Sequence, residues 1–209
     1  MGGPCWLLKE VPEEKRTGRF QGPPCTDNFQ IAMFEYNGVT YSSCEQAFQS
    51  LKFREGTSMR STIAVTRPKH GETGSAHGMR CWQLGQSRSD PLVDQFEHAK
   101  IGLMYVVNVA KYVSNPRFKQ DLIEKTGEWP LVGGRSTADW EKWNGLIHSL
   151  IREKIKNDAD LHIELARDVS NLVEMKKLQV EMLALWKEPE AESESDSDAI
   201  YHQVNFKST

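Results

Sequence analysis

The stretch that decides the fold is Phe34 to Phe53, "FEYNGVTYSSCEQAFQSLKF". Its Asn37-Gly38 pair lies between two short runs of aromatic and β-branched residues. A type I′ turn needs positive φ at both central positions, so this pattern predicts a β-hairpin. Ser42-x-x-Glu45 then matches a capping box, and an apolar face follows it. We therefore expect a hairpin that leads directly into an amphipathic helix.

Three polar side chains of that helix lie on one stripe: Glu45, Gln49 and Lys52. Seven residues at 100° each return Lys52 to within about 20° of Glu45, with a rise of roughly 10 Å. The two groups do not pair as neighbours, but long side chains can converge on a ligand between them. Periodicity alone favours a simpler interpretation, in which Glu45 closes the capping box and Lys52 is a boundary residue.

The remaining sequence is mainly helical. Apolar residues recur at helical spacing in residues 92–115, 117–129, 141–157 and 161–188. Residues 66–92 are rich in Gly, Ser, Arg and His, which predicts a long loop or a set of short turns. The pattern predicts an α+β fold, predominantly helical, with a small β-hairpin or sheet. We expect a flexible segment over 1–24, one domain over 25–156, a helical extension over 157–187 and a disordered acidic tail over 188–209.

Composition narrows the function classes. The net charge of −3 gives no global basic field, so bulk electrostatic binding of nucleic acid is not expected. No apolar run approaches the roughly 18 residues that span a bilayer, and no signal peptide is recognisable. The four cysteines form no C-x-x-C pair, so we expect no metal site and reduced thiols. We also expect no cofactor, and a protein of the cytoplasm or nucleus.

Two further segments are candidates for ligand contact. Asp139 stands beside Trp140, and Trp143-Asn144 follow; an acid among aromatic rings suits a purine or a sugar. The alternative is that Asp139 caps a helix and the tryptophans are core. In the loop before the hairpin, Asn28 either contacts a ligand or belongs to an Asx turn. The basic residues of 66–92 either clamp phosphates or are ordinary surface charges.

Taken together, three segments resemble the NADAR domain family. Residues 27–53 resemble its opening motif, an Asn-Phe pair before a hairpin and a Tyr-x₃-Glu-x₆-Lys helix. Residues 103–132 resemble its next block, and residues 139–153 resemble its last, which ends at Arg152. The matching positions in the first two blocks are Asn28-Phe29, Tyr41, Glu45, Gln49, Lys52, Phe53, Met104, Lys111, Asn115-Pro116, Leu122, Thr126-Gly127 and Leu131-Val132.

The resemblance implies that residues 25–156 are a catalytic domain of the NADAR type. Such domains act as N-glycosidases, so the chain is expected to be a hydrolase that removes ADP-ribose from the amino group of guanine in nucleic acid or nucleotide. The alternatives are hydrolysis of riboflavin-pathway aminopyrimidine ribosyl phosphates, or a non-catalytic module that binds ADP-ribose or nucleotide. The implied catalytic residues are Glu45, Lys52 and Asp139, and the implied substrate-binding residues are Asn28, Phe29, Tyr41, Gln49, Trp143, Asn144 and Arg152.

Overall fold

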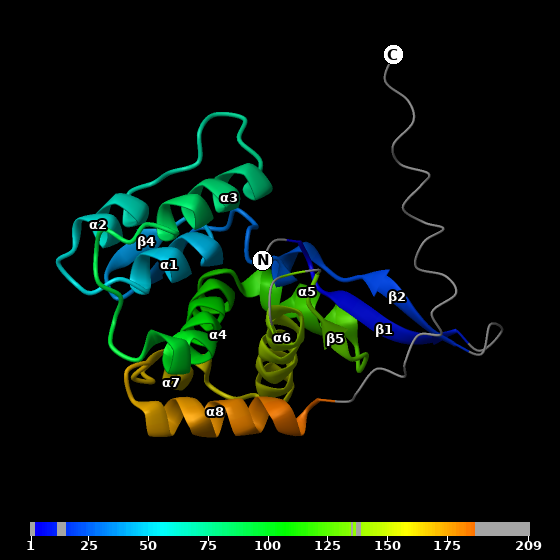
Figure 1. Ribbon diagram of the computed structural model, residues 1–209. Helices are drawn as coiled ribbons and strands as arrows, with labels where there is room; N and C mark the ends of the chain where they lie inside the picture. The colour runs from blue at the N-terminus through cyan, green and yellow to red at the C-terminus, as the bar shows by residue number, and fades with distance from the viewer. Residues whose placement is uncertain (1–2, 12–15, 135, 137–138, 187–209) are drawn as a thin grey trace, which may run out of the picture.

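The helix α4 (Phe96–Ser114) forms the centre of the fold, because every side chain from Ile101 to Tyr112 is buried. The computed structural model describes residues 3–11, 16–134, 136 and 139–186. Helices α1 to α3 lie to one side of α4, and α5, α6 and a three-stranded sheet lie to the other (Figure 1). The remaining bounds are β1 Trp6–Val11, β2 Arg16–Gln21, a 3-10 turn Pro24–Thr26, β3 Phe34–Tyr36, β4 Val39–Tyr41, α1 Cys44–Leu51, α2 Ser58–Ala64, α3 Gly74–Gly85, α5 Pro116–Thr126, β5 Leu131–Val132, α6 Trp140–Lys156, α7 Leu161–Leu165 and α8 Leu172–Ala184. The predicted α+β, predominantly helical class is confirmed.

The predicted hairpin is confirmed. Asn37 and Gly38 have φ values of 50° and 73°, and β3 pairs antiparallel with β4. Helix α1 follows, but its cap lies one residue later than predicted. The Ser43 side chain accepts from the Gln46 backbone N–H at 3.2 Å, and Gln46 Oε1 accepts from the backbone N–H of residue 42 at 2.7 Å. Glu45 therefore takes no part in the cap.

The N-terminal residues form two strands where we expected a flexible segment. β1 pairs antiparallel with β2 and also with β5, with Trp6 opposite Val132 and Leu7 opposite Leu131. Leu7 and Leu8 are buried by this pairing. The sequence around these strands is rich in glycine, proline and charged residues, so its short apolar run did not predict a strand. The partner strand β5 lies far along the chain, and local sequence does not predict such a distant pairing.

The expected loop over residues 66–92 contains a twelve-residue helix, α3. Its glycines permit a very close approach to neighbouring elements. A Cβ at Gly74 would lie 2.5 Å from the carbonyl oxygen of Phe29, and one at Gly78 would lie 2.4 Å from the Phe29 ring. The glycine content that argued against a helix thus allows this helix to pack closely on residue 29.

The C-terminal helices complete the same core. Met175, Leu178 and Met182 of α8 are fully buried. A Cβ at Gly102 of α4 would lie 1.7 Å from the Met175 sulfur, so α8 crosses α4 closely, as Figure 1 also shows. The expected helical extension over 157–187 therefore packs back on the core. The acidic tail, residues 188–209, lies outside the described residues.

None of the helices in the described part of the chain is long and apolar enough to cross a bilayer.

Candidate active site

The stripe predicted on the first helix lies in the interior of the protein. Glu45 is 0% exposed, Gln49 2% and Lys52 8%. Glu45 stands in the first turn of α1, and Lys52 is the residue at which α1 ends. The helix N-terminus carries a partial positive charge that favours a carboxylate. The capping role that would have explained Glu45 is taken by Ser43 and Gln46 instead.

Two oxygens on this stripe have no hydrogen-bond partner among the described residues. Glu45 Oε1 accepts from Gln49 Nε2 at 2.7 Å, which fixes the carboxylate and the amide against each other. Glu45 Oε2 and Gln49 Oε1 are buried and unpartnered. Native proteins rarely leave buried polar atoms without a partner, because each one costs about 1–3 kcal/mol. The two oxygens make this stripe a candidate site for the polar groups of a ligand.

The burial of the stripe shifts the pKa of both ionisable groups. Burial raises the pKa of Glu45 from 4.5 to about 7, although the Gln49 hydrogen bond and the Lys52 charge oppose the rise. Burial also lowers the pKa of the Lys52 amine, and Glu45 opposes that shift in turn. A carboxyl group that titrates near neutral pH can both give and take a proton. An amine with a lowered pKa is a better nucleophile than an exposed lysine.

Helix α3 covers this stripe at its last residue. A Cβ at Gly85 would lie 1.9 Å from Gln49 Oε1 and 3.1 Å from Lys52 Nζ. Only glycine allows the end of α3 to lie so close to both side chains. In Figure 1, α3 runs alongside α1, and the two helices form one end of the molecule.

A chain of three hydrogen-bonded, buried asparagines connects the backbone at Glu45 to α4 and α6. Asn108 Nδ2 donates to Asn28 Oδ1 at 3.0 Å, and Asn28 Nδ2 donates to Asn144 Oδ1 at 3.0 Å. The carbonyl oxygen of Asn28 accepts from the backbone N–H of Glu45 at 2.9 Å. The structure thus joins Asn28 and Asn144 to the start of α1. Sequence reasoning missed Asn108, whose signal is one amide within the apolar run of α4.

Two other expected substrate contacts lie within the core. Phe29 is 3% exposed and lies beneath α3. Tyr41 is 1% exposed, and its ring centroid lies 6.1 Å from that of Phe34. Both side chains support the elements around the stripe, and whether either of them meets a substrate stays a prediction.

The structure places Asp139 and Trp143 at the start of α6. Asp139 is exposed, and its carboxylate makes no capping hydrogen bond to that helix, although its carbonyl oxygen accepts from the Trp143 N–H at 2.9 Å. Trp143 is half-buried against the core. No hydrogen bond or ion pair joins the Asp139 carboxylate to the described residues of the stripe, so its catalytic role stays a prediction.

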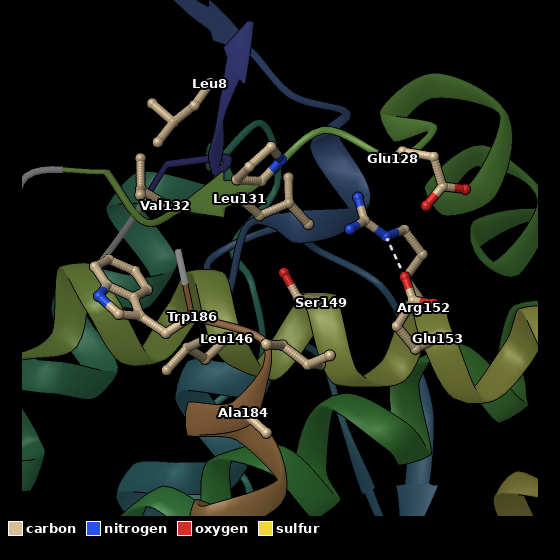
Figure 2. A pocket seen from close by; sticks show the side chains of 12 residues that line it. Leu8, Glu128, Leu131, Val132, Leu146, Ser149, Arg152, Glu153, Ala184 and Trp186 are labelled. Carbon is tan, nitrogen blue, oxygen red and sulfur yellow. Dashed lines mark hydrogen bonds and ion pairs between the residues drawn. The ribbon is translucent and has the colours of Figure 1, made fainter. Parts of the chain in front are cut away.

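Arg152 lies about two turns beyond Asn144 on α6. Its Nη1 donates to Thr126 Oγ1 at 3.2 Å and to the Trp129 carbonyl oxygen at 2.7 Å. These bonds fix the end of α5, and the guanidinium borders a separate cavity (Figure 2). Its expected contact with the substrate of the α1 stripe is untested.

Two arginines of 66–92 have structural partners. Arg80 forms two hydrogen bonds with the Glu72 carboxylate, at 3.0 and 2.7 Å. Arg67 donates to the carbonyl oxygens of Thr40 and Ala64. These bonds brace the segment that carries α3.

Across residues 3–11, 16–134, 136 and 139–186, no three His, Cys, Asp or Glu side chains are grouped so as to hold a metal ion.

Comparison with known proteins adds one structural likeness. No family model matches the chain, and no curated protein matches it. The chain is similar to the NMR structure of the E. coli protein YbiA, with a TM-score of 0.54 and 22% sequence identity, over 65% of this chain and 79% of that one. At this identity the likeness shows the fold alone, and it supports the NADAR-like fold that the sequence motifs predict.

Proposed function

We propose that this chain is an N-glycosidase that hydrolyses the bond between ribose and an amine nitrogen, and that its substrate is ADP-ribose linked to the amino group of guanine. The observation that carries the proposal is the buried pair Glu45 and Lys52 on one helix, with Glu45 Oε2 unpartnered and a pKa near 7 on that carboxyl group. The family resemblance supplies the substrate class, and the fold likeness agrees with it.

The chemistry needs a proton at one end of the broken bond and a hydroxyl group at the other. Protonated Glu45 gives its proton to the leaving amine nitrogen while the C1′–N bond breaks. Water then supplies a hydroxyl group to C1′, and the carboxylate takes the proton that water loses. The balance is one water consumed, with free amine and free sugar formed.

Lys52 acts on the sugar. In one version the sugar ring opens to an imine between C1′ and the guanine nitrogen, and the neutral Lys52 amine adds to C1′. The guanine amine then leaves with a proton from Glu45, and water hydrolyses the resulting Schiff base to the free sugar and the Lys52 amine. In the other version the ammonium group only stabilises and orients charge. Gln49 stands between the two groups, and its unpartnered Oε1 would accept from a ribose hydroxyl group once the end of α3 moves away from it.

Glu45 has no exposed atom in this structure, so the proposal requires an opening beside the stripe. Lys52, at 8% exposure, lies nearest to solvent, and the end of α3 covers it. A small displacement of Gly85 away from α1 would uncover both Gln49 Oε1 and Lys52 Nζ.

One comparison of substrates tests the proposal. The full chain is offered DNA that carries ADP-ribosylated guanine, the free ADP-ribosylated guanosine nucleotide, and the aminopyrimidine ribosyl phosphate. Release of ADP-ribose from a guanine substrate supports the proposal. Release only from the aminopyrimidine, or binding with no release from any substrate, refutes it.

Matched variants separate chemistry from folding. Glu45→Gln is expected to lower turnover by about 10² or more while the protein stays folded, because it removes the acid and keeps the shape. Glu55→Gln is the control, since Glu55 is exposed. For the Schiff base, borohydride is added during turnover and the protein mass is measured. If neither wild type nor Lys52→Ala gains mass while wild type turns over, the covalent version is wrong; Lys176→Ala, on exposed α8 surface, is the control.

A further inference from the structure

A cavity of about 220 Å³ lies between β1, β5, α6 and the end of α8 (Figure 2). It is smaller than the roughly 300–1,000 Å³ of sites for drug-sized ligands, so it suits a compact molecule. Much of its wall is apolar and comes from four separate elements or their ends. The apolar residues are Leu8, Pro130, Leu131, Val132, Leu146, Ala184, Leu185 and Trp186.

The opposite end of the cavity presents hydrogen-bond donors. Figure 2 shows the Ser149 hydroxyl group and the Arg152 guanidinium on the same side, directed toward Leu131. Arg152 uses Nη1 for Thr126 and Trp129, and its Nε donates to Glu153 Oε1 at 3.3 Å. No hydrogen bond joins its Nη2 to the described residues, which leaves that nitrogen available to a ligand.

Charges of both signs line this end: the Arg152 guanidinium and the Glu128 and Glu153 carboxylates. The Arg152 side chain is only 6% exposed, and its one ionic contact is the long one to Glu153. That carboxylate is shared with Lys156, which also pairs with Glu128. Lys156 pairs with both of these carboxylates, so the Arg152 guanidinium can still gain from a ligand carboxylate at Nη2, because charge-assisted hydrogen bonds are about twice as strong as neutral ones.

The apolar end has a fixed aromatic surface. The Lys142 ammonium lies 4.9 Å from the centroid of the Trp186 ring, which holds the ring by a cation–π contact. An aromatic or short aliphatic body would pack between this ring and the leucines of the wall.

This cavity is separate from the α1 stripe. Ser149 follows Asn144 by five residues, which places it about 140° around α6. Asn144 hydrogen-bonds to Asn28 on the side of α1, whereas Ser149 lines the cavity under β5. The same helix therefore contributes to two places on different faces.

We propose that this cavity binds a small organic carboxylate with a compact apolar body. The carboxylate accepts from Arg152 Nη2 and the Ser149 hydroxyl group, and the body lies against Trp186 and the leucines. The proposal is independent of the glycosidase activity.

The test uses cinnamate and its neutral isostere cinnamamide, added to the full chain and followed by calorimetry and amide NMR shifts. We expect cinnamate to bind, with shifts at Ser149 and the Trp186 indole, and cinnamamide to bind about tenfold or more weakly. Ser149→Leu fills the cavity and should abolish binding. Ser75→Leu, on exposed α3 surface, should leave binding unchanged.

Ser149→Ala is a milder variant that keeps the proposal testable if the leucine disturbs the fold. It removes one hydrogen bond, so the affinity for cinnamate should fall about fivefold. Equal affinity for acid and amide would overturn the anionic site. Binding that survives both Ser149 variants, or no binding of cinnamate at millimolar concentration, would overturn the cavity as a ligand site.

Discussion

Replacing Glu45 by glutamine should make the protein more stable at alkaline pH. The folded protein holds this carboxyl group at a pKa of about 7, against 4.5 for an ordinary glutamate. In that interval the folded state binds more protons than the unfolded state, so stability falls as pH rises from about 4.5 and levels off above 7. At about 1.4 kcal/mol per pKa unit, the loss is on the order of 3 kcal/mol. Glutamine keeps the shape and carries no charge to desolvate.

The assay is urea unfolding of wild type and Glu45→Gln at pH 5 and pH 8. The two proteins should have nearly equal unfolding free energies at pH 5, and the variant should be more stable at pH 8 by up to the amount above. Glu55→Gln should show no such pH-dependent difference, because Glu55 is exposed. A variant that is less stable than wild type by the same amount at both pH values would refute the reasoning, since it would mean that the carboxylate is well stabilised where it lies.

Three further outcomes follow from the packing and burial. Gly145→Ala should lower the unfolding free energy by about 2 kcal/mol or more, because its Cβ would lie 2.0 Å from the Leu131 carbonyl oxygen, and a normal denaturation midpoint would contradict this contact. Gly85→Ala should fold but lose turnover, since its Cβ displaces the Gln49 amide; unchanged kcat in a glycosidase assay would remove Gln49 from the site. Burial lowers the pKa of His148, so below about pH 6.5 the unfolded protein takes up a proton at this residue that the folded protein does not. Stability therefore falls as pH falls, and His148→Gln should flatten that part of the unfolding profile measured from pH 7 to 5.

The hairpin and the main helices were predictable because their signals are local. Asn37-Gly38 sets its turn by backbone conformation alone, and α4 to α6 carry apolar residues at helical spacing. The shared stripe of Glu45, Gln49 and Lys52 also follows from helix geometry. Their burial does not, because it depends on α3 and on asparagines from other parts of the chain.

The features that the sequence did not predict depend on close tertiary contacts. Glycine lowers helix propensity by about 1 kcal/mol, so the glycines of α3 predicted a loop. In the structure the same residues make room for Phe29 and Gln49, and packing outweighs propensity. The cap at Ser43 was misplaced by one residue because Ser42 and Ser43 are chemically equal candidates, and only the backbone decides between them.

The pairing of β1 with β5 also has a consequence for how the chain is made. Trp6 lies opposite Val132 in this pairing, so β1 cannot complete its sheet until the chain has been synthesised as far as β5. Such distant pairings form slowly, because a long loop must close before any contact is gained. During that interval β1 and β2 present an unfinished edge. We expect the nascent chain to depend on chaperones until β5 emerges, more than its helical content alone would suggest.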